Sequence, residues 1–151
     1  MFNKNCIGMT LPEHRATADP ARLRFFAKAI GETDAVYTDE AVARAAGHPA
    51  LPLPPTFLFC LDTDARDDAR WLSDLGISYP DVLHAGQSFI YHRMAYAGET
   101  LRFNSQITDM YSKNDGALIF VVLETSVKDQ RGEPVAELKT TIVERKKGIR
   151  A

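Results

Sequence analysis

The chain has 151 residues, of which 45% are hydrophobic and 25% charged, with a formal net charge of −2. This length and composition predict one domain, residues 1–151, with a core of its own. A near-neutral chain without a basic cluster before its tail gives no reason to expect a nucleic-acid surface. Because Met1 to Cys6 lacks an apolar stretch after a basic start, we expect no signal peptide, a cytoplasmic location and no membrane partner.

The first half of the chain is predicted to hold short elements. His14–Ala18 is expected to form a short first strand. Asp19 followed by Pro20 is typical of a helix start, since Asp caps free amides and Pro suits the first helical position. Gly31 is expected to end this helix. A second short helix is predicted over Asp39–Ala46.

A proline-rich stretch then leads into an uncharged apolar run. Pro54 and Pro55 are typical of a helix start, and Thr56 to Leu61 contains no charged residue. A helix that is apolar all round must be buried on every side, so this one needs a sheet that curls around it. The charged stretch Asp64–Arg70 that follows is predicted to be a solvated turn or frayed helix.

The second half changes to a strand-like pattern. Runs rich in β-branched and aromatic residues are separated by Gly, Asn and Asp turn signals, and they cover Gln87–Ala95, Glu99–Met110, Ala117–Val127 and Pro134–Glu144. Short connections predict an antiparallel meander. The third run is apolar on both faces, which favours a central or interface strand. A buried helix followed by a wrapping antiparallel sheet predicts an α+β hotdog fold, and such domains usually pair sheet edge to sheet edge.

Several segments resemble the MaoC-like dehydratases. They are Ala29–Glu40, Ala43–Gly47, Thr56–Leu58, Leu83–Arg93 and Ala97–Leu101. The chain is most similar to the N-terminal, FAS-type dehydratase domains and to the non-catalytic subunits of mycobacterial β-hydroxyacyl-ACP dehydratase heterodimers. The resemblance covers nearly the whole chain and implies a hotdog fold. It also implies acyl thioesters of CoA or acyl carrier protein as ligands, with no separate cofactor.

The resemblance also places the family's catalytic groups. Active members, similar to (R)-specific enoyl thioester hydratases, carry a Gly-Asp-x-Asn-Pro-x-His loop, and a glycine amide that stabilises the thioester oxygen. Here the Asp position is Glu32, the His position is Tyr37, and the glycine falls at about Pro55. A tyrosine ordinarily titrates near pH ~10 and is a poor proton acceptor at neutral pH. Because proline has no N–H, only the following amide, at Thr56, could replace the glycine amide.

These departures favour a substrate-holding subunit with weak or no activity alone, beside a catalytic MaoC-like partner. His84 and Gln87 are predicted as a substrate-binding polar pair at the mouth of an acyl tunnel, although they could instead cap a strand end. No Cys/His cluster has metal-ligand spacing. Two alternatives stay open. One is a self-sufficient homodimeric (R)-specific enoyl-CoA hydratase or dehydratase, and the other is a hotdog thioesterase in which Glu32 activates water.

Overall fold

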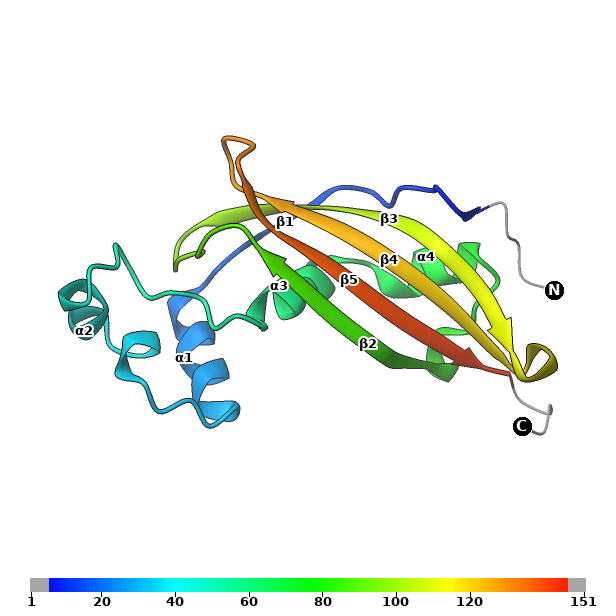
Figure 1. Cartoon of the computed structure of the whole chain (residues 1–151), viewed down its shortest axis with the longest axis horizontal. Helices are drawn as coiled ribbons and strands as arrows, with labels where there is room; N and C mark the ends of the chain where they lie inside the picture. The colour runs from blue at the N-terminus through cyan, green and yellow to red at the C-terminus, as the bar shows by residue number, and fades with distance from the viewer. Residues whose placement is uncertain (1–5, 147–151) are drawn as a thin grey trace.

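The computed structural model describes residues 6–146, with helices in the first half and a long sheet in the second (Figure 1). The helices are α1 (Pro20–Ala29), α2 (Glu40–Ala45), α3 (Phe57–Ala65) and α4 (Asp68–Asp74), with short 3-10 turns η2 (Ala35–Tyr37), η3 (Tyr79–Asp81) and η4 (Asn114–Gly116). The strands are β1 (His14–Thr17), β2 (Val82–Tyr91), β3 (Thr100–Lys113), β4 (Leu118–Lys128) and β5 (Pro134–Arg145). Within residues 6–146, no helix is long and apolar enough to cross a membrane. Residues 1–5, which carry most of the signal-peptide prediction, lie outside the described residues.

The strands form one antiparallel sheet in the order β1-β3-β4-β5-β2. β4 is the central strand, as its apolar faces predicted: Val121 and Leu123 are fully buried on one face and Val122 is nearly so on the other. The predicted meander is wrong for β2, which pairs with β5 instead of β3. The reason lies in residues 92–99, whose amides bond to Val135 and Leu51 and carry the chain across the sheet end instead of closing a hairpin.

The bounds of β2 also differ from the prediction. The strand begins at Val82 and ends at Tyr91, whereas Gln87–Ala95 was expected. A register shift between His84 and Gly86 interrupts the regular pairing with β5, which continues on both sides of it. Ala95 lies beyond the strand, where its carbonyl accepts a hydrogen bond from the Leu53 amide.

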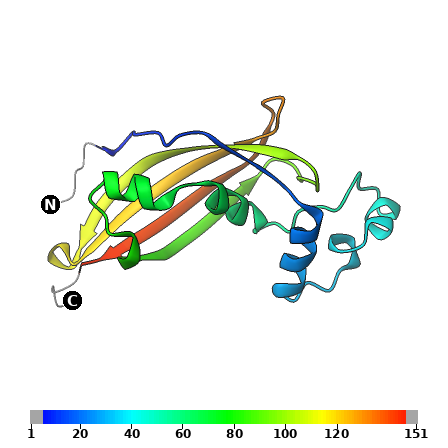
Figure 2. The ribbon, with the colours of Figure 1, turned by 180° about the vertical axis from the view of Figure 1, so that it is seen from behind.

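Helices α3 and α4 lie against the same face of the sheet (Figures 1 and 2), whereas α1 and α2 extend beyond one end of it. Phe57, Leu58 and Leu61 of α3 are buried in one core with Phe103 and Leu138 of the sheet. The prediction of burial on every side is wrong for the single chain, because one sheet covers one side of the helix. Residues 59 and 60 are only partly buried. The helix begins just after the two prolines, which form the turn that leads into it.

Most of the charged segment Asp64–Arg70 is exposed, as predicted, but Arg66 and Asp68 are partly buried. Asp62 is fully buried and the Arg66 side chain is only 7% exposed, and the two are joined by a 2.7 Å hydrogen bond. Arg66 also pairs with Asp68, whose carboxylate accepts the Trp71 indole N–H. Burial acts to lower the pKa of Arg66, but Asp68 and Asp62 outweigh it, so that the pKa is raised. His14 of β1 lies 3.1 Å from the other Asp62 oxygen, not aligned for a hydrogen bond.

Candidate functional site

The loop between α1 and α2 holds Glu32 and Tyr37. Gly31, with φ of 74°, supplies the left-handed residue that ends α1. Glu32 Oε1 then accepts hydrogen bonds from the Thr33 and Asp34 amides, each at 2.9 Å. Asp34 in turn caps η2, the turn that places Tyr37 at its end. One carboxylate oxygen of Glu32 is therefore engaged in shaping this loop.

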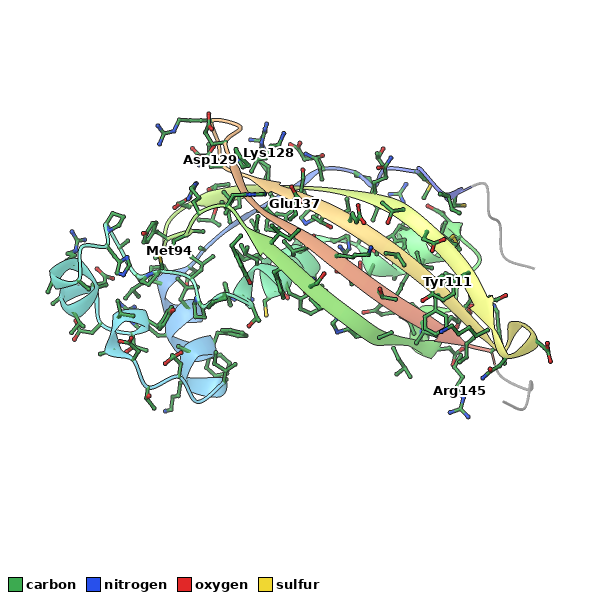
Figure 3. All side chains as sticks on the ribbon, viewed as in Figure 1. Met94, Tyr111, Lys128, Asp129, Glu137 and Arg145 are labelled. Atoms are coloured by element: carbon green, nitrogen blue, oxygen red, sulfur yellow. The ribbon has the colours of Figure 1, made fainter. Side chains whose placement is uncertain are left out.

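Tyr37 and Pro55, two of the predicted site residues, line one small pocket of about 120 Å³ beside the start of α3. Its walls are otherwise mostly apolar and are completed by Leu53, Leu58, Tyr91, Arg93, Met94 and Ala95. Figure 3 shows Met94 at the end of the sheet nearest α1 and α2. The pocket thus brings together the loop after α1, the start of α3 and the end of β2.

The pocket also contains Tyr91, which sequence reasoning did not single out. Its hydroxyl donates a 2.6 Å hydrogen bond to the carbonyl oxygen of Pro55, and burial raises the pKa of this hydroxyl. The alternation of Phe89 with Tyr91 could have indicated that Tyr91 faces the helix. The two rings stack with their centroids 5.6 Å apart.

This hydrogen bond determines how the peptide between Pro55 and Thr56 is oriented. None of the peptide bonds in the described residues is cis, and in a planar trans peptide the carbonyl and the following N–H point in opposite directions. With the carbonyl turned toward Tyr91, the Thr56 N–H points away from that hydroxyl. The side of this peptide that faces Tyr91 therefore presents an acceptor, whereas a developing oxyanion needs a donor.

His84 and Gln87 lie together, but against a later part of α3. The His84 ring stacks on Phe59 at 4.9 Å, and its Nε2 is 3.3 Å from Gln87 Oε1. The same Gln87 oxygen accepts from the Thr140 hydroxyl at 2.7 Å. His84 and Tyr91 are seven positions apart along β2, which is roughly 20 Å of strand at about 3.3 Å per residue. The two predicted groups of site residues are therefore not brought together at one point.

Arg93 lines the pocket, but its guanidinium is turned to acidic partners. It bonds to Glu99 at 2.8 Å and to Asp129 at 3.2 Å. The hydrogen bonds to Glu99, which outweigh the opposing effect of burial, raise the pKa of Arg93. Burial acts to raise the pKa of Asp129, but hydrogen bonds from two backbone amides of its own turn and from Arg93 outweigh it and lower the pKa. No group of three His, Cys, Asp or Glu residues suited to a metal ion occurs in the described part of the chain.

Comparisons with known proteins agree with this architecture. The family model for the FAS1-like, dehydratase domain region matches residues 5–138. A UPF0336 protein of Saccharopolyspora erythraea is 34% identical over 126 residues, which cover 82% of this chain and 78% of that protein.

Two solved structures share the fold. The C-terminally truncated HadBC (3R-hydroxyacyl-ACP dehydratase) complex from Mycobacterium tuberculosis gives a TM-score of 0.77 at 21% identity, covering 91% of this chain and 96% of that one. A MaoC-like dehydratase gives 0.79 at 22% identity, covering 94% of this chain and 43% of that one. The chain therefore has a hotdog fold and belongs to the family of the FAS1-like dehydratase domain region.

Proposed function

We propose that this chain is the substrate-holding member of a 3-hydroxyacyl-thioester dehydratase, or enoyl hydratase, system and that it acts beside a catalytic MaoC-like subunit. Membership of the dehydratase family supports the reaction class. A solved neighbour that is a complex of 3R-hydroxyacyl-ACP dehydratase supports a role within an assembly. In this role the chain binds an acyl thioester and has weak or no activity alone.

The proposal rests on the residues that stand where active family members carry catalytic groups, namely Glu32, Tyr37 and Pro55. Removing or adding water at a thioester needs a group that exchanges protons and a donor that stabilises the oxygen as it gains charge. Glu32 gives one carboxylate oxygen to the amides of its own loop. Tyr37 replaces a histidine, and Pro55 presents a carbonyl that is already bonded to Tyr91. The chain therefore lacks both the proton-exchanging group and the oxygen-stabilising donor that the active pattern supplies.

One edge of the sheet, formed by β2, supports the proposal that a catalytic partner binds this chain. β2 ends the strand order, so in the described part of the chain one of its sides pairs with no other strand. An exposed edge strand is a template for pairing unless charges or prolines protect it. Here Leu83, Ile90 and Tyr91 are 61%, 59% and 45% exposed. We therefore assign this edge to the catalytic partner.

The experiment compares the chain alone with a complex. The chain is co-expressed with a MaoC-like subunit from the same genome that carries the Gly-Asp-x-Asn-Pro-x-His pattern. We expect a heterodimer by light scattering, and crotonyl-CoA hydration that is lost when the partner's Asp is replaced but kept in Glu32→Gln. A homodimer of this chain that hydrates crotonyl-CoA by itself, and that loses the activity in Glu32→Gln, would establish the self-sufficient enzyme instead.

A further inference from the structure

The hydroxyl of Tyr37 is the unengaged polar group of the pocket beside α3. The Tyr91 hydroxyl is bonded to the Pro55 carbonyl, and the Arg93 guanidinium is bonded to Glu99 and Asp129. Within residues 6–146, by contrast, no hydrogen bond is formed by the Tyr37 hydroxyl. The residue is partly buried and lines a mostly apolar pocket. A ligand atom that enters there meets one available hydroxyl in apolar surroundings.

Two properties limit what this pocket can take. A phenol can donate a hydrogen bond, so a carbonyl oxygen is a suitable partner for it. The volume of about 120 Å³ is well below the roughly 300 Å³ of a small drug-binding cavity, and it equals about four water-sized units of ~30 Å³ each. A methylene group is of similar size, so the pocket suits a chain of about four carbons.

We propose that this pocket binds a short acyl thioester of about four carbons, with the Tyr37 hydroxyl donating a hydrogen bond to the thioester carbonyl. The inference rests on the proposed function, because that function supplies the thioester. It gives Tyr37 a role opposite to that of the family's histidine: the phenol holds the ligand and takes no proton from it. The acyl chain lies against Leu53, Leu58 and Met94, which supply the apolar walls.

The test varies the protein and the ligand together. Affinities of the purified chain are measured by titration calorimetry for butyryl-CoA and for S-butyl-CoA, a thioether that lacks only the carbonyl oxygen. Tyr37→Phe is expected to weaken butyryl-CoA binding about fivefold, the usual effect of one neutral hydrogen bond, and to leave S-butyl-CoA binding unchanged. Tyr79→Phe, at an exposed tyrosine in η3, is the matched control and is expected to change neither affinity.

A spectroscopic readout separates a hydrogen bond from a general loss of structure. The infrared stretch of ¹³C-labelled thioester carbonyl is expected at lower frequency in the wild-type complex than in the Tyr37→Phe complex. Equal weakening of both ligands in Tyr37→Phe, or an unchanged carbonyl frequency, would overturn the assignment of Tyr37. If the wild-type chain binds neither ligand, the proposed function itself fails.

Chain length is tested with the same assay. An acyl chain that continued to be buried would gain roughly fourfold in affinity for each added methylene. Because the pocket is filled by about four carbons, octanoyl-CoA is expected to bind within about threefold of butyryl-CoA. A steady gain in affinity from butyryl-CoA to octanoyl-CoA would overturn the short-chain assignment.

Discussion

The buried pair between Asp62 and Arg66 makes a sharp prediction about stability. The two side chains are 0% and 7% exposed, and their hydrogen bond is 2.7 Å long. In Arg66→Met the carboxylate of Asp62 keeps its burial but loses its cation, and His14 at 3.1 Å is not aligned to replace it. Breaking one side of a buried pair typically costs about 3–5 kcal/mol of the free energy of unfolding.

The assay is urea unfolding followed by circular dichroism. For Arg66→Met we expect a loss of about 3–5 kcal/mol, which corresponds to a drop in Tm of roughly 10 °C for a chain of this size. The matched control is Lys139→Met, which breaks a pair with Glu124 whose side chains are both 54% exposed, and it should cost at most about 1 kcal/mol. The double variant Asp62→Leu, Arg66→Met should recover most of the loss, because it leaves no unpaired buried charge. The reasoning is refuted if Arg66→Met costs less than about 1 kcal/mol, or if the double variant is no more stable than Arg66→Met.

Three further predictions concern single groups. Since the folded-state pKa of Asp129 is lowered, its stabilising effect is present above the unfolded value of about 3.9 and is lost as the pH falls through the folded value. Asp129→Asn should therefore lose less stability on acidification than the wild-type chain does, and acid unfolding curves of the same shape for both proteins would contradict this. Burial, followed by the charge of Asp64, raises the pKa of the Cys60 thiol. At pH 8, iodoacetamide should therefore modify Cys60 more slowly in the folded chain than in the chain unfolded by urea, as peptide mass spectrometry can check, and equal rates would refute the shift. Tyr91→Phe removes the hydrogen bond to Pro55 and should cost about 1 kcal/mol in urea unfolding, whereas an unchanged midpoint would show that the bond contributes nothing.

Local signals in the sequence were sufficient for several elements. Asp19 and Pro20 begin α1 as predicted, with the Asp19 side chain accepting from the Arg22 amide. Asp39 caps α2 in the same way. The β3–β4 and β4–β5 hairpins also follow their turn residues. These features depend on side chains and backbone groups within a few positions of each other, which a sequence pattern records.

Features that depend on distant contacts could not be predicted in this way. The pairing of β2 with β5 is determined by how residues 92–99 cross the sheet, and no turn signal reports it. Asp62 and Arg66 are only four positions apart, but their burial depends on His14 of β1 beside Asp62 and on the Trp71 ring beside Arg66, which no local pattern reports. The role of Tyr91 depends on a hydrogen bond to a residue 36 positions away.

The candidate site was predicted in part. Family resemblance indicated Tyr37 and Pro55 as site positions, and both line the same pocket. Their distance from His84 and Gln87 follows from the length of β2 between the two groups, and the resemblance alone did not indicate it. Whether these residues bind a thioester stays a prediction.

The most direct measurement is the rate at which the purified wild-type chain, without any partner, hydrates crotonyl-CoA. Absorbance of the enoyl thioester is followed over time, with a known (R)-specific enoyl-CoA hydratase as the positive control. The account predicts a rate at or near the uncatalysed background, unchanged in Glu32→Gln. Turnover at about 1 s⁻¹ or faster, the lower end of typical enzyme rates, that disappears in Glu32→Gln would contradict it.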